Sequence, residues 1–154
     1  MSILKKHDVE LLVSSLDKCE AGNLPSEVFE SVARIAVYPA IEFIPLRKKN
    51  NRIEVLLFER PSTDLMWPSM FHTPGTILRP TDATYQDAFD RLYKDELMNL
   101  ETAPPFYMGT HLSRNKRGTC VLIEYILDVK GEPVAGTFYD VDNLPELFIE
   151  DQKP

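Results

Sequence analysis

Two adjacent carboxylates, Asp95 and Glu96, are the residues whose type and position are best suited to chemistry. They lie downstream of a Pro74-Gly75 turn, and Arg91 precedes Asp95 by one helical turn. Carboxylate oxygens are preferred ligands of Mg²⁺ and Mn²⁺, and a guanidinium at i−4 can hold a carboxylate in place. The pattern therefore indicates a binding site for a hard divalent cation. Such a site would suit chemistry on a phosphorylated ligand.

The helix that carries these carboxylates is predicted over residues 83–100. On a helical wheel its apolar residues form one broad arc, made of Tyr85, Ala88, Phe89, Leu92, Tyr93 and Leu100. Glu96 falls near the middle of this arc, where a carboxylate must be paired, protonated or bound to a cation. Two interpretations stay open: a metal ligand, or a glutamate that reaches solvent or pairs with a distant basic residue.

Strands on both sides must position this helix. They are predicted over residues 36–46, 53–58, 106–112, 119–127 and 137–141, with a hairpin turn at 48–51 and an irregular loop at 61–69. Two further helices are predicted first, over residues 2–20 and from Ser26, as N-cap, to about residue 35. This order predicts an α/β fold, a mixed sheet flanked by helices. We expect one domain over 1–154, with a helical N-terminal extension (1–35) and the sheet with its catalytic helix (36–147).

The composition excludes several classes of protein. Of the 154 residues, 24 are acidic and 17 basic, and the net charge of −7 argues against nucleic-acid polymers and anionic membranes as partners. No apolar run approaches the ~20 residues of a membrane helix, and the N-terminus lacks an apolar signal core. Cys19 and Cys120 form neither a disulfide framework nor a metal-ligand pattern. We therefore expect a reduced, cytoplasmic protein.

Three segments, in this order, resemble the Nudix hydrolase family. The first is the strand Val55–Phe58 with Glu59-Arg60 after it, the second runs from Phe71 to Thr76, and the third is the helix through Arg91 to Glu96. In that family a strand ending in Leu-Leu and a basic residue precedes a Trp-x-x-Pro-Gly-Gly turn. A glutamate and then a helix with Arg-Glu and Glu-Glu pairs follow. The resemblance covers residues 36–147.

This sequence departs from the family pattern at several positions. Phe71 stands for the Trp, Thr76 for the second Gly, Asp82 for the first Glu, Leu92 for the Glu after the arginine and Met98 for the final Gly, and one extra residue precedes Arg91. Asp82 equally suits the N-cap of a helix that starts near residue 83. Thr76 would cost about 1–2 kcal/mol if the turn needed a positive φ. Since Leu92 removes an oxygen donor, we expect a weakened metal site that Leu92→Glu would strengthen.

The resemblance implies an α/β/α sandwich around a mixed sheet, and catalysis with Mg²⁺ or Mn²⁺ bound to helix carboxylates. Carried over to this chain, Glu96 is the first metal ligand, Asp95 the second and the main-chain carbonyl of Thr76 the third. Arg91 would orient the carboxylates, so Arg91 and Glu96 are the expected catalytic residues.

Three residues are the candidates for substrate binding. Arg60, directly after a strand, is expected to contact a phosphate. Arg117, at a hairpin tip, is either a phosphate clamp or a solvated charge. Phe71 either stacks on a nucleobase or belongs to the core.

The form Arg-Leu-x-x-x-Glu-Leu is similar to the GDP-mannose mannosyl hydrolase branch, which keeps one glutamate for magnesium. That branch uses a histidine base in a late loop, and residues 130–150 contain no histidine. The resemblance implies a metal-dependent hydrolase of a nucleoside diphosphate linked to another group. Its ligand would be a small nucleotide, and a homodimer is left open. The alternative, favoured by Leu92 and Thr76, is a Nudix-fold binding or regulatory module that has lost catalysis.

Overall fold

The computed structural model describes residues 4–98 and 100–149. Its helices are α1 (Lys6–Leu16), α2 (Ser26–Ala33) and α3 (Tyr85–Leu92), and α3 continues into a π-helical segment, η1 (Tyr93–Leu97). Its strands are β1 (Tyr38–Lys49), β2 (Arg52–Glu59), β3 (Phe71–His72), β4 (Gly75–Ile77), β5 (Glu101–Thr102), β6 (Phe106–Asn115), β7 (Gly118–Lys130) and β8 (Thr137–Asp140). Among the described residues, no helix has the length and apolar character needed to span a membrane.

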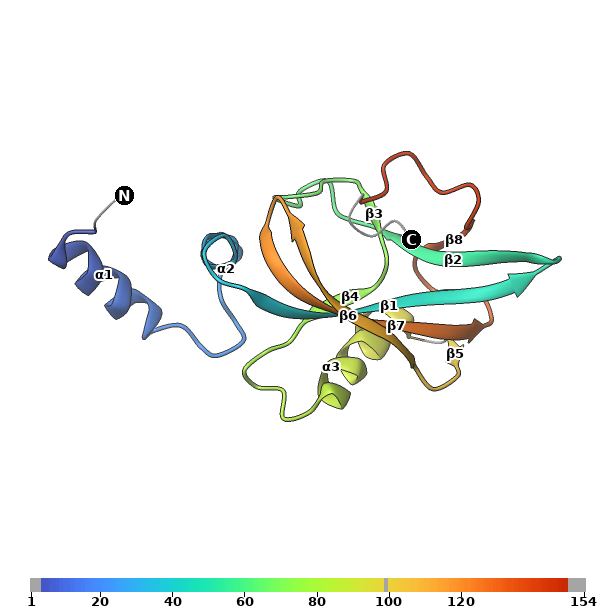
Figure 1. Ribbon diagram of the computed structural model, residues 1–154, viewed down its shortest axis with the longest axis horizontal. Coiled ribbons are helices and arrows are strands. Elements are labelled where there is room, and N and C mark those ends of the chain that lie inside the picture. Colours follow the sequence, from blue (N-terminus) through green and yellow to red (C-terminus); the bar gives the residue numbers. More distant parts are fainter. Residues whose placement is uncertain (1–3, 99, 150–154) are drawn as a thin grey trace.

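The strands form one mixed sheet, drawn at the centre of Figure 1. The strand order is β3-β2-β1-β7-β5, with β4 paired to β1, β6 to β7 and β8 to β2. β1 and β7 run parallel, whereas the remaining pairs are antiparallel. The β1–β2 hairpin turns at Asn50 and Asn51, both at positive φ, as such two-residue turns require. The predicted α/β fold with a mixed sheet and helices is confirmed.

One face of the sheet packs against α3, which lies below the strands in Figure 1. The contact is aromatic: the Phe43 ring on β1 lies 5.1 Å from that of Phe89 and 5.6 Å from that of Tyr93. The Tyr125 ring on β7 lies 5.0 Å from that of Phe89. Offset and edge-to-face rings at these separations add to the stabilisation from area burial, so the position of α3 on the sheet is well determined.

The opposite face of β2 belongs to a second apolar cluster. Side chains alternate along a strand, so Leu56 and Phe58 join the α3 cluster while Val55 and Leu57 face the other side. There they meet Phe148, from the segment after β8. In the described part of the chain this face is thus covered by an irregular segment rather than by a second long helix.

The two N-terminal helices differ in how they relate to the sheet. α2 lies against the β6–β7 hairpin, and Gly118 there needs to be glycine because a Cβ would overlap the carbonyl oxygen of Ala33. Its N-cap is Pro25, so the prediction of Ser26 as N-cap is wrong by one residue. α1 stands apart from the sheet in Figure 1, and none of its residues is buried. The predicted single domain with a boundary at residue 35 stays a prediction.

Candidate functional site

The π-helical segment that ends α3 carries both predicted metal-binding carboxylates. A π-helix has i→i+5 bonding and is found mostly as a short bulge in an α-helix, frequently at functional sites. Leu92 and Leu97 are core residues, 2% and 1% exposed, and Asp95 is exposed. Glu96 is only partly exposed, and its Oε2 atom is buried without a hydrogen-bond partner among the described residues.

The surroundings of Glu96 disfavour its charged form. Burial raises the pKa of Glu96 to about 7, with the charge of Arg60 lowering it and that of Asp95 raising it further. A buried carboxylate without a donor either takes up a proton or binds a cation. The buried Oε2 therefore suits either of two states, a protonated carboxyl group or a ligand of a divalent cation.

The number of ligands is small. No group of three or more His, Cys, Asp or Glu side chains in the described part of the chain is arranged to hold a metal. Leu92 lies in the core cluster with Ile41 and Phe43, so the expectation that a glutamate at this position would add a ligand is not supported. Mg²⁺ is commonly held by one or two carboxylates together with substrate phosphates, and Asp95 and Glu96 suit that mode.

Arg91 does not orient either carboxylate, contrary to the sequence-based expectation. Its guanidinium forms a two-pronged ion pair with Asp82, and its Nη2 donates to the carbonyl of Ile77 at 3.2 Å. Hydrogen bonds from Arg91 lower the pKa of Asp82, against the opposing effect of burial. Arg91 thus ties α3 to the loop before it, and its role is positioning the helix.

Asp82 is not the N-cap of α3, because the helix begins two residues later than that interpretation requires. Thr84 is the N-cap, and its backbone N–H donates to Asp87 Oδ2 at 2.8 Å. Asp82 instead closes the preceding turn, accepting from the Arg79 backbone N–H at 2.7 Å. Of the two alternatives for Asp82, the N-cap is wrong, and its ion pair with Arg91 was not predicted from the sequence.

The Pro74-Gly75 segment is extended rather than a left-handed turn. Gly75 and Thr76 belong to β4, opposite Glu42 and Ile41 of β1, and neither has a positive φ. The strain expected for Thr76 is therefore absent. Glycine at position 75 eases the close approach of β4 to β1, since a Cβ there would lie 3.2 Å from the Ile41 carbonyl oxygen.

The predicted ligand role of the Thr76 carbonyl is not supported by the β1–β4 ladder. Phe43 N–H donates to the Pro74 carbonyl at 2.9 Å, and Leu78 N–H to the Pro39 carbonyl at 3.1 Å. Because hydrogen-bonded pairs alternate in an antiparallel ladder, the Ile41–Thr76 pair lies in a hydrogen-bonded position. The Thr76 carbonyl accordingly points toward β1.

A cleft of about 690 Å³ lies beside this segment. Its walls come from α2, the loop after β2, β4 and the adjoining part of β1 and β7, and Arg60, Thr76 and Arg117 are among its lining residues. Asp95 and Glu96 are not. Arg60 connects the cleft with the carboxylates of η1, because it lines the cleft and its charge also lowers the pKa of Glu96.

Arg60 is held by a carboxylate of the loop that follows it. Its Nε and Nη2 donate to Asp64 Oδ2 at 2.9 and 2.6 Å. Asp64 Oδ1 accepts from the backbone N–H groups of Met66 and Trp67. Burial alone would raise the pKa of Asp64, but these hydrogen bonds outweigh it and lower that pKa to about 2. The loop is thus a fixed wall that presents Arg60.

Arg117 also lines the cleft and is likewise paired. Its Nε donates to both carboxylate oxygens of Glu30 on α2, at 2.9 and 3.1 Å. Its guanidinium carbon lies 4.7 Å from the Trp67 ring and 5.4 Å from that of Phe29. Of the two interpretations of Arg117, a solvated charge does not hold, since the side chain is 17% exposed. Whether it contacts a phosphate stays a prediction.

Phe71 does not line the cleft, so its predicted stacking on a nucleobase is not supported. Its ring packs 5.4 Å from that of Tyr139 in the second apolar cluster. The Phe71 backbone N–H donates to the Leu147 carbonyl at 2.8 Å. Of the two interpretations of Phe71, the core position is the one present.

The charges lining the cleft balance. In formal charges, the three basic residues of the lining, Arg60, Arg79 and Arg117, are matched by three acidic ones, Glu30, Glu42 and Asp64. His72 adds none at neutral pH, because burial lowers its pKa to about 4. A net cationic phosphate trap is thus absent from this lining.

Three features of the site were not found from the sequence. The π-helical turn has no recognisable residue signature, and the partners Asp64 and Glu30 pair with Arg60 and Arg117 across loops and elements. The i, i+4 spacing of Arg60 and Asp64 was a usable signal for the first pair. The second joins residues 87 positions apart, so only the fold reveals it.

No family model and no curated protein matches the chain. Several solved protein structures are similar to the chain. A MutT Nudix hydrolase from Burkholderia pseudomallei is 13% identical, with 75% of this chain and 93% of that chain covered and a TM-score of 0.57. The Ap4A hydrolase of C. elegans is 14% identical, with 70% and 83% covered and a TM-score of 0.52.

A third similar structure is the C-terminal domain of mouse MUTYH, solved in complex with human PCNA. It is 12% identical, with 77% of this chain and 83% of that chain covered and a TM-score of 0.58. At such low identity these likenesses show the fold. The chain has the fold of Nudix hydrolases, as the resemblance implied.

Proposed function

We propose that the protein is a divalent-metal-dependent hydrolase of a nucleoside diphosphate linked to another group. The observation that carries the proposal is the buried, unpartnered Oε2 of Glu96, next to Asp95 and within the field of Arg60. The Nudix fold supports the same reading.

Glu96 and Asp95 would hold Mg²⁺ or Mn²⁺. When bound, such a cation neutralises phosphate charge and activates water. Arg91 and Asp82 would act indirectly, by fixing the helix relative to β4. Arg60 would contact a phosphate oxygen, exchanging part of its pairing with Asp64 for a charge-assisted bond to the phosphate.

The balanced charge of the cleft favours a particular substrate class. A nucleoside triphosphate brings several negative charges, which this lining would not offset. A diphosphate with uncharged groups at both ends brings two, which one divalent cation neutralises. The cleft of about 690 Å³ is within the usual range for ligand sites. A nucleoside-diphosphate sugar is therefore the first choice, and the mannosyl hydrolase branch stays part of this proposal.

Calorimetric titration with Mg²⁺ and Mn²⁺, followed by a hydrolysis screen, tests the proposal. The screen contains nucleoside-diphosphate sugars, dinucleoside polyphosphates and nucleoside triphosphates. Glu96→Gln should abolish the metal signal and turnover. The matched control is Asp90→Asn, an exposed carboxylate of the same helix, which should change neither. Metal binding that survives in Glu96→Gln would refute the assignment.

The second candidate is a Nudix-fold binding or regulatory module without catalysis. Two observations favour it: the buried Leu92 leaves few ligands, and one similar fold was solved bound to another protein. Tight, metal-independent binding of a nucleotide without turnover of any compound in the screen would select this candidate.

We also propose a cytoplasmic location. It is supported by Cys19 and Cys120, which are both free thiols, as expected in a reducing compartment.

A further inference from the structure

α1 carries a stripe of aliphatic side chains that nothing in the described structure covers. Val9, Leu12, Val13 and Leu16 follow at i, i+3, i+4 and i+7, which places them on one side of the helix. They are 42%, 50%, 50% and 37% exposed. None of the eleven residues of α1 is buried.

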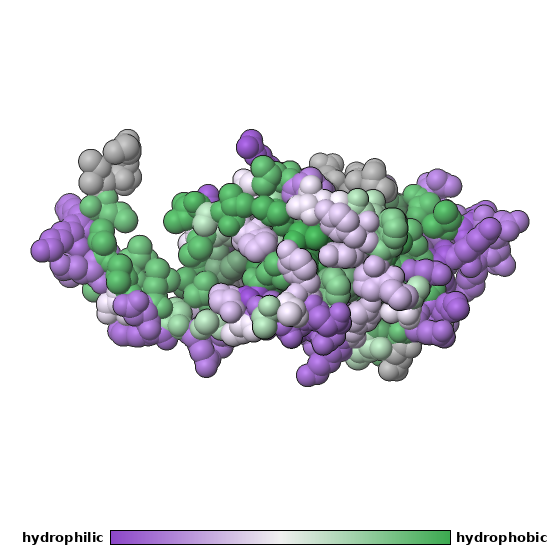
Figure 2. Space-filling view, turned by 60° about the horizontal axis from the view of Figure 1, so that its bottom comes forward, coloured by the Kyte–Doolittle hydropathy of each residue, from purple (hydrophilic) through white to green (hydrophobic). Residues whose placement is uncertain are grey.

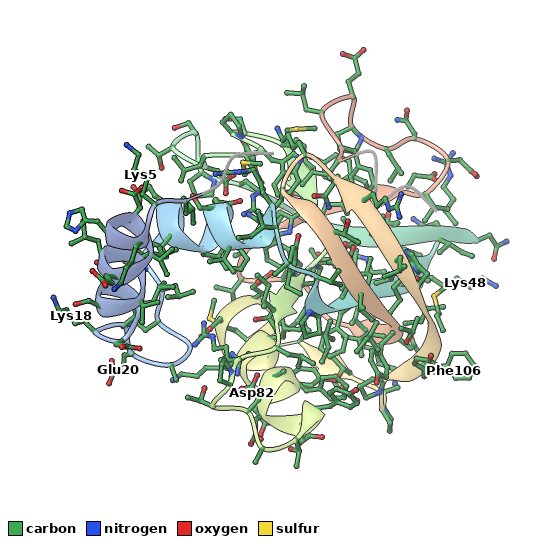
Figure 3. All side chains as sticks on the ribbon, turned by 60° about the vertical axis from the view of Figure 1, so that its left-hand side comes forward. Lys5, Lys18, Glu20, Lys48, Asp82 and Phe106 are labelled. Carbon is green, nitrogen blue, oxygen red and sulfur yellow. The ribbon has the colours of Figure 1, made fainter. Side chains whose placement is uncertain are left out.

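A helix of this kind needs a partner. Isolated helices shorter than about 12–15 residues are marginal in water, and helices in proteins are stabilised mainly by packing of their apolar face. Figure 3 shows α1 outside the sheet region, with Lys5 and Lys18 near its two ends. In Figure 2 the apolar side of α1 is turned toward the body of the domain across a gap.

We propose that a second copy of this chain supplies the partner, by antiparallel pairing of the two α1 helices about a two-fold axis. An isologous contact of this type uses the same surface twice. With the axis between positions 12 and 13, Val9 of one copy lies opposite Leu16 of the other, and Leu12 opposite Val13. All four side chains of the stripe then pack at one seam.

The charges beside the stripe fit this arrangement. Lys6 and Asp17 lie on the same flank of the stripe, near opposite ends of the helix, and both are exposed. In an antiparallel pair the same flanks of the two helices face each other. Lys6 of each copy thereby comes next to Asp17 of the other, which gives two identical ion pairs. The contact that Lys6 makes within its own helix, to Glu10, is long at 3.8 Å and exposed.

The oligomeric state of the full chain tests this proposal. We expect a dimer in sedimentation velocity at micromolar concentration. Leu12→Glu should weaken dimerisation about tenfold or more, while glutamate keeps a high helix propensity. The matched control is Leu11→Glu, which is equally exposed at 55% but lies off the stripe, and should leave the dimer intact. Circular dichroism checks that both variants remain helical.

Charge reversal gives a second, independent measurement. Lys6→Glu and Asp17→Lys should each weaken the dimer several-fold, and the double variant should recover most of the loss. A monomeric parent at all concentrations overturns the proposal, including the case in which α1 folds onto exposed Ile35, Val37 and Leu112 of its own chain. A dimer that survives Leu12→Glu uses another surface and overturns it as well.

Discussion

The carboxylates near the two ends of the helix formed by α3 and η1 differ in their hydrogen bonding: those near the first end have partners, and one near the second end has a buried oxygen without one. At the first end, Asp82 is doubly bonded to Arg91, and Asp87 accepts from the Thr84 backbone. At the second end, Glu96 has a buried oxygen with no hydrogen-bond partner among the described residues. The pKa of Asp82 is lowered, whereas that of Glu96 is raised to about 7.

Under the proposed function, this difference separates a structural use of acidic residues from a functional one. A buried carboxylate costs free energy unless it is paired, so the paired end contributes to stability. Glu96, at the unpaired end, lowers the stability of the protein in the absence of a ligand, as expected of a proposed cation ligand. Four substitutions test whether the contrast is real.

Leu92→Glu is expected to have the largest effect. Leu92 lies four residues before Glu96 but inside the apolar cluster, 2% exposed. A carboxylate there should lower the free energy of unfolding by about 4 kcal/mol and should create no metal site. Urea unfolding measures the loss, with Leu92→Met as a near-isosteric control costing less than about 1.5 kcal/mol. A stable Leu92→Glu protein with improved metal binding would mean that position 92 faces the site after all.

Asp82→Ala should break the paired end. It leaves the partly buried guanidinium of Arg91 without its ion pair, and loss of one partner of such a pair costs about 3 kcal/mol. The control is Asp90→Ala, whose carboxylate is exposed and should matter by no more than about 0.5 kcal/mol. Equal effects from the two variants in urea unfolding would contradict a special role for the Asp82–Arg91 pair.

Glu96→Gln should change how stability depends on pH. Between the ordinary pKa of 4.5 and the folded value of about 7, the folded protein keeps a proton that the unfolded chain has released. The free energy of unfolding therefore falls as pH rises through this window, by about 2 kcal/mol after allowance for partial exposure, and levels off above it.

In Glu96→Gln this decline should disappear. Between pH 4.5 and 7 the free energy of unfolding of the variant should therefore rise relative to that of the parent. Unfolding curves recorded from pH 4 to 8 measure the difference. Asp64, with a pKa lowered to about 2, contributes stability that is lost only below about pH 4, outside this window. Parallel pH profiles for parent and variant would show that Glu96 is not buried as an unpaired acid.

Thr84→Ala should have the smallest effect. It removes the N-cap side chain of α3, and such changes cost about 1 kcal/mol. Because the cap lies at the paired end, metal affinity in calorimetry should stay at the parental value. A loss of metal binding together with the loss of stability would show that the two ends are coupled through the helix.

Local patterns were sufficient for most of the fold. The continuous apolar runs within β2 and β7 predict buried strands, and Asn50-Asn51 predicts the turn between β1 and β2, because both signals act within a few residues. The helix with Glu96 in its apolar arc followed from periodicity. The exact start of α3, at Tyr85, could not be predicted from periodicity, since both Asp82 and Thr84 are good capping residues.

The site was less predictable because its contacts are long-range. The sequence by itself determined which residues are ionisable, where most strands and helices form, and that one carboxylate falls on an apolar face. Only the tertiary structure decided that Arg91 pairs with Asp82, that Phe71 packs against the second apolar cluster, and that Glu30 of α2 holds Arg117. A side chain's partner depends on which segments the fold brings together and on the local turn of the helix, and neither is encoded in neighbouring residues.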